Sequence, residues 1–231
     1  MFEISPAEWT AILLSLRVAI IATLVATPFG IALAWLLARY NFWGKSVLDA
    51  LVHLPLVLPP VVTGYLLLLT FGRRGLVGAW LADNLGIVFA FRWTGAALAC
   101  GVMSFPLLVR PIRLSIEAID RRLEQAASTL GAAPWRVFAT VTLPLALPGI
   151  LAGMVLGFAK AIGEFGATIT FVSNIPGETQ TISSAIYSLI QTPDGDSAAG
   201  RLVLVSIVIA MSALIASEWF ARRATKRLHG N

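Results

Sequence analysis

Five long apolar runs divide this chain and restrict what it can fold into. They lie near residues 9–38, 47–71, 86–109, 146–172 and 202–220. A helix needs about 20 mainly apolar residues to cross the hydrocarbon core of a bilayer. A helix also satisfies its own backbone N–H and C=O groups, which a lipid environment requires. We therefore expect an all-α integral membrane protein with about five transmembrane helices.

The composition supports this class and a single structural unit. Hydrophobic residues make up 58% of the 231 residues and charged residues only 13%, whereas soluble domains carry about 25% charged residues. The length fits one transmembrane domain over 1–231. The only cysteine, Cys100, excludes an internal disulfide and is expected to be a small buried side chain. The net charge of +5 does not indicate nucleic acid, because the basic residues gather at the ends of apolar runs.

The distribution of lysine and arginine predicts the orientation in the membrane. With the N-terminus outside, eleven of the 17 basic residues fall on inner segments, including Arg222, Arg223, Lys226 and Arg227 near the C-terminus. Four fall on outer segments, and among these the pair Arg73-Arg74 runs against the rule that cytoplasmic loops are basic. We expect the N-terminus outside the cell and the C-terminus in the cytoplasm. No basic region precedes the first run, so a membrane span is expected there rather than a signal peptide.

The polar segment 120–144, DRRLEQAASTLGAAPWRVFATVTLP, separates the third and fourth runs on the predicted cytoplasmic side. Asp120 is a plausible N-cap for a helix over 121–130, and Gly131 fits the left-handed position after its end. Pro134 suits the first turn of a second helix. Spacing alone is also compatible with an ordinary helix-turn-helix loop, in which the small residues serve only local packing.

This segment resembles the EAA loop of ABC-importer permeases, which docks onto a separate ATP-hydrolysing subunit. The matching positions are Ala126, Ala127, Gly131, Val141 and Leu143-Pro144. Two residues depart from the family pattern: Gln125 replaces the usual Glu, and Val141 replaces Ile. An acid, Glu124, stands directly before Gln125. The resemblance implies that 120–144 is the coupling loop and that Arg121, Arg122 and Glu124 form its polar rim.

A closer resemblance extends over nearly the whole chain. Residues 53–65 (HLPLVLPPVVTGY), 72–78 (GRRGLVG) and 163–191 (GEFGATITFVSNIPGETQTISSAIYSLIQ) are similar to molybdate ABC-transporter permeases. Sulfate/thiosulfate permeases and tungstate transport are the alternatives. The resemblance implies the type I ABC-importer permease (MetI-like) fold and a multi-pass location in the bacterial inner membrane, with the N-terminus periplasmic. It also implies a homodimer, two ABC ATP-binding subunits on the cytoplasmic side and a periplasmic molybdate-binding protein. A short amphipathic helix within 174–200 would border the outer mouth or serve loop packing only.

The sequence contains no pattern typical of an enzyme site. Gly44-Lys45-Ser46 matches the end of a P-loop, but Arg39 stands where its first glycine is required, and the segment follows a membrane span. We expect no catalytic residue, metal site or bound cofactor, with ATP used by the partner subunit. An autonomous channel or secondary transporter, which needs no docking loop, is one alternative class. An intramembrane enzyme, which needs a catalytic pair inside the spans, is another.

Prolines in the second run point to a translocation pathway. Pro55, Pro59 and Pro60 each remove a helix N–H and disturb the preceding turn. Freed backbone groups at membrane depth are tolerated only against protein or a wet cavity, and broken helices indicate transport paths. Pro59 and Pro60 are therefore pathway candidates. A packed kink that never meets the substrate is the alternative.

The fourth run carries small and polar residues at helical spacing. Gly149, Gly153 and Gly157 form a ridge for close helix packing. At about 100° per residue, Lys160, Glu164 and Thr168 are expected on the same face, and charged residues inside a span suggest function. Lys160 could offset the substrate's charge, or the Lys160–Glu164 pair could only stabilise the bundle. Arg17 in the first run is expected to extend towards the outer surface.

Overall fold

A computed structural model describes the backbone of residues 4–229 and the side chains of residues 4–216. All regular secondary structure in the described part is helical, and it contains no strand. The basic residues expected near the C-terminus, from Arg222 onward, lie outside the described side chains. The helices are α1 (Pro6–Arg39), α2 (Lys45–Val57), α3 (Pro60–Phe71), α4 (Leu76–Leu85), α5 (Trp93–Glu117), α6 (Arg121–Thr129), α7 (Pro134–Val137), the π-helical turn η1 (Phe138–Thr142), α8 (Leu143–Ile162), α9 (Gly166–Val172), α10 (Ile182–Leu189) and α11 (Asp196–His229).

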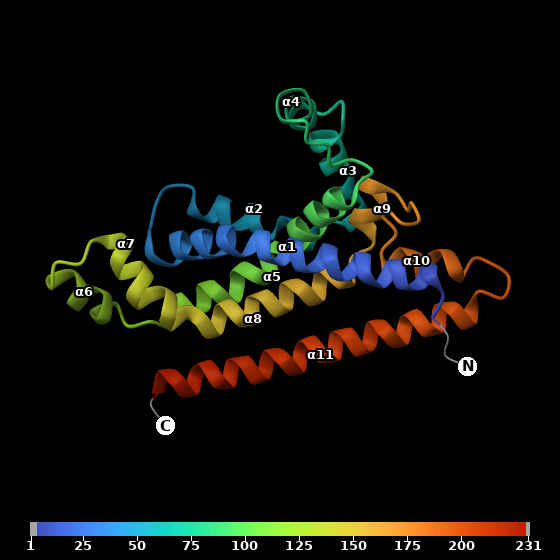
Figure 1. Ribbon diagram of the computed structural model, residues 1–231. Coiled ribbons are helices and arrows are strands. Elements are labelled where there is room, and N and C mark those ends of the chain that lie inside the picture. The colour runs from blue at the N-terminus through green and yellow to red at the C-terminus, as the bar shows by residue number, and fades with distance from the viewer. Residues whose placement is uncertain (1–3, 230–231) are drawn as a thin grey trace.

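Four long helices run side by side as a bundle, with α5 packed against both α1 and α8, and α11 along α8 (Figure 1). The predicted glycine ridge of α8 makes one of these contacts. A Cβ at Gly149 would lie 2.7 Å from the carbonyl oxygen of Pro111, and a Cβ at Gly153 would lie 2.5 Å from that of Leu108. The ridge therefore lets the backbones of α5 and α8 approach closely.

The expected number of five spans is reached only if the bent pair of helices α2 and α3 is counted as one span. Four stretches are long and apolar enough to cross a membrane: Pro6–Arg39, Trp93–Glu117, Pro134–Ile162 and Asp196–Ala216. The predicted span 47–71 is instead two helices, α2 and α3, bent by 114°. The bend falls at Leu58, Pro59 and Pro60, where the two prolines cannot continue the hydrogen bonds of α2.

Two other predicted spans are misplaced. The third begins at Trp93 rather than near residue 86, because Gly86 ends α4 with a φ of 65° and an irregular segment follows. It continues past residue 109 to Glu117. The fourth begins at Pro134 rather than near 146 and ends at Ile162 rather than 172. Hydropathy misplaced these ends for two reasons. The helix α5 continues through polar turns after its apolar run, and apolar residues continue in α9 after α8 has ended.

The N-terminal ends of α1 and α11 are joined by an ion pair. Ser5 and Glu8 form a capping box at the start of α1. The Glu8 carboxylate also pairs with Arg201 near the start of α11, with an Oε1–Nη2 distance of 3.0 Å. The short helix α10, which was predicted within 174–200, packs at this same end of the bundle (Figure 1).

Helices α3 and α4 project away from the bundle as an arm (Figure 1). Helix α3 packs mainly on α9, and α4 packs on α3. Several large apolar side chains of the arm are exposed, among them Tyr65, Leu69, Leu76 and Trp80.

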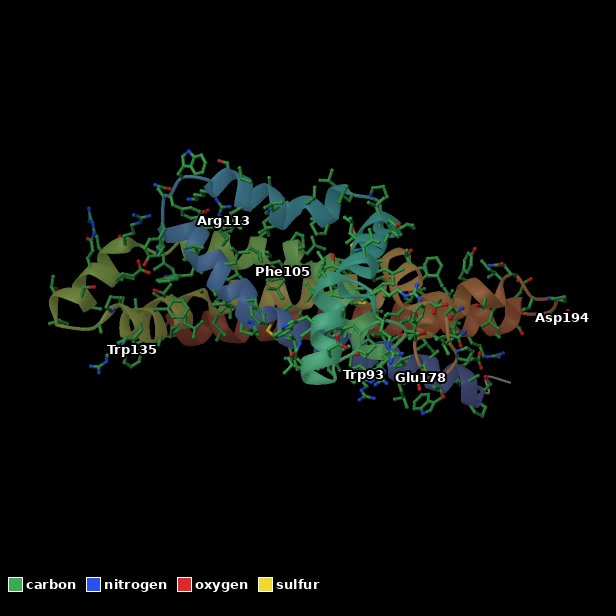
Figure 2. The ribbon with its side chains drawn as sticks, turned by 90° about the horizontal axis from the view of Figure 1, so that it is seen from above. Trp93, Phe105, Arg113, Trp135, Glu178 and Asp194 are labelled. Atoms are coloured by element: carbon green, nitrogen blue, oxygen red, sulfur yellow. The ribbon has the colours of Figure 1, made fainter. Side chains whose placement is uncertain are left out.

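On the opposite side of the break, α2 lies along α5, and Figure 2 shows Arg113 of α5 close to α2. An apolar groove of about 660 Å³ lies between α1, α2 and α5.

Candidate functional site

The hairpin of α6 and α7 has the capping chemistry predicted for the segment after residue 120. The Asp120 carboxylate accepts a hydrogen bond from the backbone N–H of Arg122 at 2.9 Å. Gly131 has a φ of +83°. Its N–H bonds to the Ser128 carbonyl at 3.0 Å, and the Ala132 N–H bonds to the Ala127 carbonyl at 3.2 Å. These two bonds form a Schellman motif, which ends α6 sharply and turns the chain towards α7.

The segment 120–144 is not a self-contained loop, however. The predicted second short helix, α7, starts at Pro134 and continues through η1 into α8 as one span. Pro144 therefore lies inside a long helix instead of closing a loop, and the π-helical turn η1 directly precedes it. Proline disturbs the carbonyl four residues earlier, and a π-turn is one way in which a helix absorbs such an interruption. The hairpin is thus joined to α8 through one continuous helical stretch.

The outer surface of the hairpin is open and partly apolar. Helix α6 has no buried residue. Arg121, Arg122 and Gln125 are exposed, as is Ala126, while Ala127 is half-buried. Three large apolar side chains stand out of the surface: Leu123 is 51% exposed, Leu130 88% and Trp135 67%. These three were not selected from the sequence, although their exposure at a predicted docking hairpin is the kind of patch that marks an interface.

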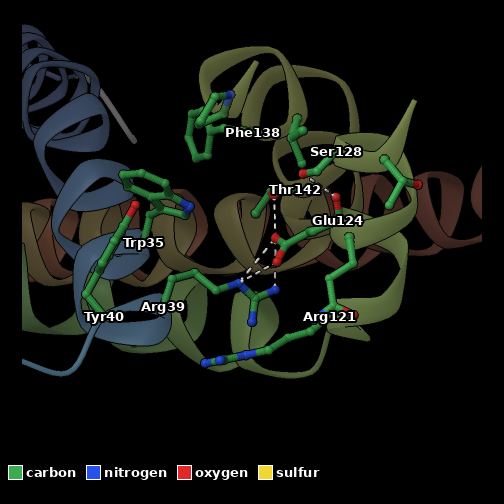
Figure 3. Close-up of a pocket in the computed structure, with 12 residues that line it drawn as sticks. Trp35, Arg39, Tyr40, Arg121, Glu124, Ser128, Phe138 and Thr142 are labelled. Carbon is green, nitrogen blue, oxygen red and sulfur yellow. Dashed lines mark hydrogen bonds and ion pairs between the residues drawn. The ribbon is translucent and has the colours of Figure 1, made fainter. Parts of the chain in front are cut away.

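Glu124 was expected on the polar rim, and the structure corrects this. Its carboxylate turns inward, with Oε2 3.0 Å from Nε of Arg39 and Oε1 3.0 Å from Nη2 of the same guanidinium (Figure 3). Thr142 Oγ1 donates a third hydrogen bond to Oε1 at 2.6 Å. The side chains of Arg39 and Glu124 are only 9% and 17% exposed. Glu124 is therefore committed to contacts within its own chain.

Aromatic rings frame this ion pair. Trp35 packs edge-on against Tyr40 and Phe138, with ring centroids 5.2 and 5.3 Å apart. The rings, the ion pair and the inner side of α6 line a pocket of about 500 Å³, to which Arg121 and Gln125 also contribute (Figure 3). In the sequence, Arg39 stood out only as the residue that breaks the P-loop pattern, and Thr142 was not selected. No local signal marks either one, because their common partner lies on another element.

The structure brings the two predicted pathway segments together. Helix α8 ends at Ile162, and α9 begins at Gly166 after a short break. This break faces the break between α2 and α3, because a Cβ at Gly166 would lie 2.7 Å from Cβ of Pro60. A Cβ at Gly64 would likewise lie 2.5 Å from the carbonyl oxygen of Ala167. Two interrupted helices therefore meet at their interruptions, as broken helices do around transport sites.

Lys160 and Glu164 form the ion pair that their spacing predicts, with a Nζ–Oε2 distance of 2.8 Å. Glu164 is 2% exposed, and its second oxygen accepts the backbone N–H of Ala167 at the start of α9. The prediction of one continuous helical face was wrong, because the break after Ile162 places Glu164 and Thr168 beyond the end of α8. Thr168 is buried and donates to the Phe165 carbonyl. These contacts fit a stabilising pair.

Two further residues lie near this region. Arg17 is exposed, and its guanidinium also stacks on the ring of Trp93 at 3.8 Å. Thr63 on α3 is buried, and within residues 4–216 its hydroxyl has no hydrogen-bond partner. A buried hydroxyl without a partner is costly, and it lies on the helix that carries Gly64 against α9.

A second polar cluster ties α2 to α5. Arg113 Nη1 lies 2.9 Å from Oδ1 of Asp49, and Arg113 Nε lies 2.8 Å from Oε1 of Glu117. His53 is beside Asp49 and bonds through Nδ1 to its carbonyl oxygen. Val52 is the only fully buried residue of α2, so these charges carry much of its attachment. Arg113 and Asp49 are 64 positions apart, so no local pattern in the sequence indicates this contact.

Comparison with known proteins gives close relatives along the full length. The chain is 63% identical over 220 residues to "Molybdenum transport system permease protein ModB" of Escherichia coli strain K12, covering 95% of this chain and 96% of the relative. The corresponding protein of Haemophilus influenzae is 58% identical over 221 residues, covering 96% of each. A "Probable sulfate transport system permease protein" of Chlorokybus atmophyticus is 36% identical over 207 residues, covering 90% of this chain and 71% of the relative.

Solved structures share the fold at low sequence identity. A bacterial ABC transporter involved in the import of the acidic polysaccharide alginate matches with a TM-score of 0.74 and 20% identity, covering 95% of this chain and 80% of that one. The expected type I importer-permease fold is thereby confirmed. The family of "Binding-protein-dependent transport system inner membrane component" matches residues 26–228. This chain belongs to that family of multi-pass inner-membrane permeases.

Proposed function

We propose that this chain is the permease subunit of an ATP-driven importer that carries molybdate across the bacterial inner membrane. The observation that carries the proposal is the 63% identity, along nearly the whole length, to a molybdenum transport system permease. Identity to the probable sulfate permease is much lower, at 36%. Sulfate/thiosulfate and tungstate are the alternative substrates, because all are tetrahedral dianions.

The working assembly in this proposal contains two copies of the chain, two cytoplasmic ABC ATP-binding subunits and a periplasmic molybdate-binding protein. The projecting arm is the proposed contact with the second copy, since α3 and α4 leave the bundle and present Tyr65, Leu69, Leu76 and Trp80 away from it. The hairpin supports the ATP-binding partner, because Leu123, Leu130 and Trp135 form an open apolar surface beside the exposed Arg121 and Arg122. The N-terminus would be periplasmic and the C-terminus cytoplasmic.

In this assembly the only chemical reaction would be ATP hydrolysis, on the ABC ATP-binding subunit. The chain itself would bind no cofactor, and the ATP would be hydrolysed by the ABC subunit. Gly44, with a φ of 89°, precedes α2 in a turn after α1 rather than following a strand, which is not the setting of a phosphate-binding loop. The permease would act by changing shape between an inward-open and an outward-open form.

The translocation pathway is proposed to pass the meeting point of the two helix breaks. Pro59, Pro60, Lys160, Glu164 and Thr168 are its candidate residues. Their proximity is supported by the Pro60–Gly166 contact and by the Lys160–Glu164 ion pair. The Lys160 side chain is 29% exposed although its partner is buried, and in this proposal a passing anion approaches it from the exposed side. A dianion moving past it would gain electrostatic stabilisation without being held by a full charge.

Competition in cells tests the substrate. Cells that lack their own molybdate permease would receive this chain with its partner subunits, and uptake of labelled molybdate would be measured with excess sulfate or excess tungstate. The proposal expects uptake that resists sulfate. Suppression of uptake by the excess sulfate would instead assign the chain to sulfate transport. Suppression by the excess tungstate that is stronger than suppression by the same excess of unlabelled molybdate would favour tungstate.

A further inference from the structure

We propose that Glu124 is a positioning residue that connects the docking hairpin mechanically to α1 and α8. In this role it transmits movement inside the permease and does not contact the ATP-binding subunit. The inference rests on the proposed function and deepens it, because it names the side chain through which the hairpin pulls on the membrane helices.

The polar side-chain attachment of α6 to the long helices depends on this one residue. Helix α6 has no buried residue, so apolar packing does little to fix it. Among the described side chains, Glu124 is the only residue of α6 that makes a hydrogen bond or ion pair to another long helix. Ser128 and Thr129 bond only to carbonyl groups of α6 itself.

The two partners of Glu124 belong to different helices. Arg39 is the last residue of α1, and Thr142 lies in η1, where the span that includes α8 begins. Both of these spans pack on α5 in the bundle. A displacement of α6 is therefore applied at once to the ends of two packed helices. A second link reinforces the same connection, since Arg39 Nη2 also lies 3.4 Å from the carbonyl oxygen of Ile119 just before α6.

The surroundings make the link stiff. The ion pair is largely shielded from water, so its attraction is screened less than that of a surface pair. The guanidinium makes a two-nitrogen contact to the carboxylate, which fixes orientation as well as distance. Trp35, Tyr40 and Phe138 hold the ends of α1 and η1 together around it.

This assignment also accounts for the departure at Gln125. The acid that the hairpin needs for its internal attachment stands one position earlier, at Glu124. Gln125 is exposed and carries no charge that must be compensated. The outer side of α6 is left to Leu123, Leu130 and small residues, which suits packing against a partner surface.

The test uses the full importer, with permease, ABC subunit and binding protein reconstituted in vesicles. Three quantities are measured: association of the ABC subunit, ATP hydrolysis, and molybdate transported per ATP. Glu124→Gln removes the charge, Thr142→Val removes one hydrogen bond, and the double exchange Arg39→Glu with Glu124→Arg reverses the pair. Leu130→Ala serves as the docking variant. Glu117→Gln is the matched control, because Arg113 keeps its contact to Asp49 when Glu117 is neutralised.

We expect Glu124→Gln to retain the ABC subunit and to lower molybdate transported per ATP by about tenfold, the usual size of a coupling between sites. Thr142→Val should show a smaller loss, the double exchange should recover much of the coupling, and Glu117→Gln should resemble the unchanged protein. Loss of ABC-subunit association in Glu124→Gln, as in Leu130→Ala, without recovery in the double exchange, would overturn the proposal. Unchanged coupling in Glu124→Gln would overturn it as well.

Hydrogen exchange on the permease alone separates this inference from the proposed function. Without the Glu124 contact, the backbone amides of α6 should exchange faster, while those of α5 stay protected. This result does not depend on the substrate or on the ABC subunit. Failure of the unchanged importer to carry molybdate would contradict the proposed function only, whereas unchanged exchange of α6 in Glu124→Gln would contradict the role of Glu124.

Discussion

Gly166 and Pro60 lie in contact, so that the break after α8 and the break between α2 and α3 meet inside the protein. Each break frees backbone groups that membrane lipid cannot satisfy. Their contact keeps both breaks against protein. The same region holds the buried Glu164 carboxylate and its partner Lys160.

Gly64→Ala should separate α3 from α9. The new Cβ would lie 2.5 Å from the carbonyl oxygen and 2.9 Å from Cα of Ala167, and backbone atoms cannot move aside as a flexible side chain can. We expect a loss of about 1–3 kcal/mol of stability from overpacking, measured by thermal unfolding in detergent, with reduced transport. Gly200→Ala is the control, because its Cβ meets nothing within 4 Å. Equal stability of the two variants would contradict the close α3–α9 contact.

Gly131 should accept asparagine but not alanine or proline. Its φ of +83° costs an L-residue about 1–2 kcal/mol, while asparagine tolerates this conformation better. Proline cannot adopt it at all. Association of the ABC subunit should therefore fall in the order Asn, Ala, Pro, as followed by co-purification. Full association of Gly131→Pro would show that the shape of the hairpin is not what the partner binds.

Lys160→Met should destabilise the permease more than Glu164→Gln does. The first change leaves a carboxylate that is 2% exposed without its cation, which costs about 3–5 kcal/mol for a buried pair. The second change leaves a lysine that can reach water, and a glutamine oxygen can still accept the Ala167 N–H. Thermal unfolding of both variants checks this order.

The double variant, Lys160→Met with Glu164→Gln, separates the two roles considered for this pair. It removes both charges, so stability should return towards that of the unchanged protein. If Lys160 offsets the charge of the passing anion, transport should stay low in spite of that recovery. Recovery of transport together with stability would mean that the pair serves the bundle only.

Arg113→Gln should loosen α2 without unfolding the bundle. The cluster of Arg113 with Asp49 is 25–36% exposed at its side chains, so the expected loss of stability is about 1 kcal/mol or less. The local effect should be larger, because Val52 is the only fully buried residue of α2. Hydrogen exchange should rise in α2 and stay unchanged in α8. Lys45→Gln, which removes only an exposed contact to Asn41, is the control.

The parts of the fold that the sequence predicted are those governed by local chemistry. Asp120, Gly131 and Pro134 define the ends of α6 and α7 through caps and backbone conformation, which act within a few residues. The apolar runs likewise predicted the membrane class. Helix ends were less predictable. Helix α5 extends through Arg113, whose charge is compensated by Asp49 and Glu117. A hydropathy profile cannot anticipate such ion pairs.

The parts that could not be predicted depend on contacts between distant residues. Arg39 and Glu124 are 85 positions apart, and nothing in either local pattern indicates the other. Glu124 was therefore expected to face a partner instead of α1. The angle of 114° between α2 and α3 was equally hidden. Pro59 and Pro60 predict an interruption, but the direction after it is decided by packing of α3 on α9.

ATP-dependent uptake of molybdate into vesicles tests most directly whether this chain is the permease of an ATP-driven importer. The vesicles hold the chain with its ABC subunit, and loaded binding protein is supplied outside. ATP is placed inside the vesicles, and accumulation is compared with vesicles that lack the ABC subunit or contain a non-hydrolysable nucleotide. Accumulation against a gradient is expected only when the ABC subunit and hydrolysable ATP are both present. Equal uptake without the ABC subunit would contradict it and would identify the chain as an autonomous channel or secondary transporter.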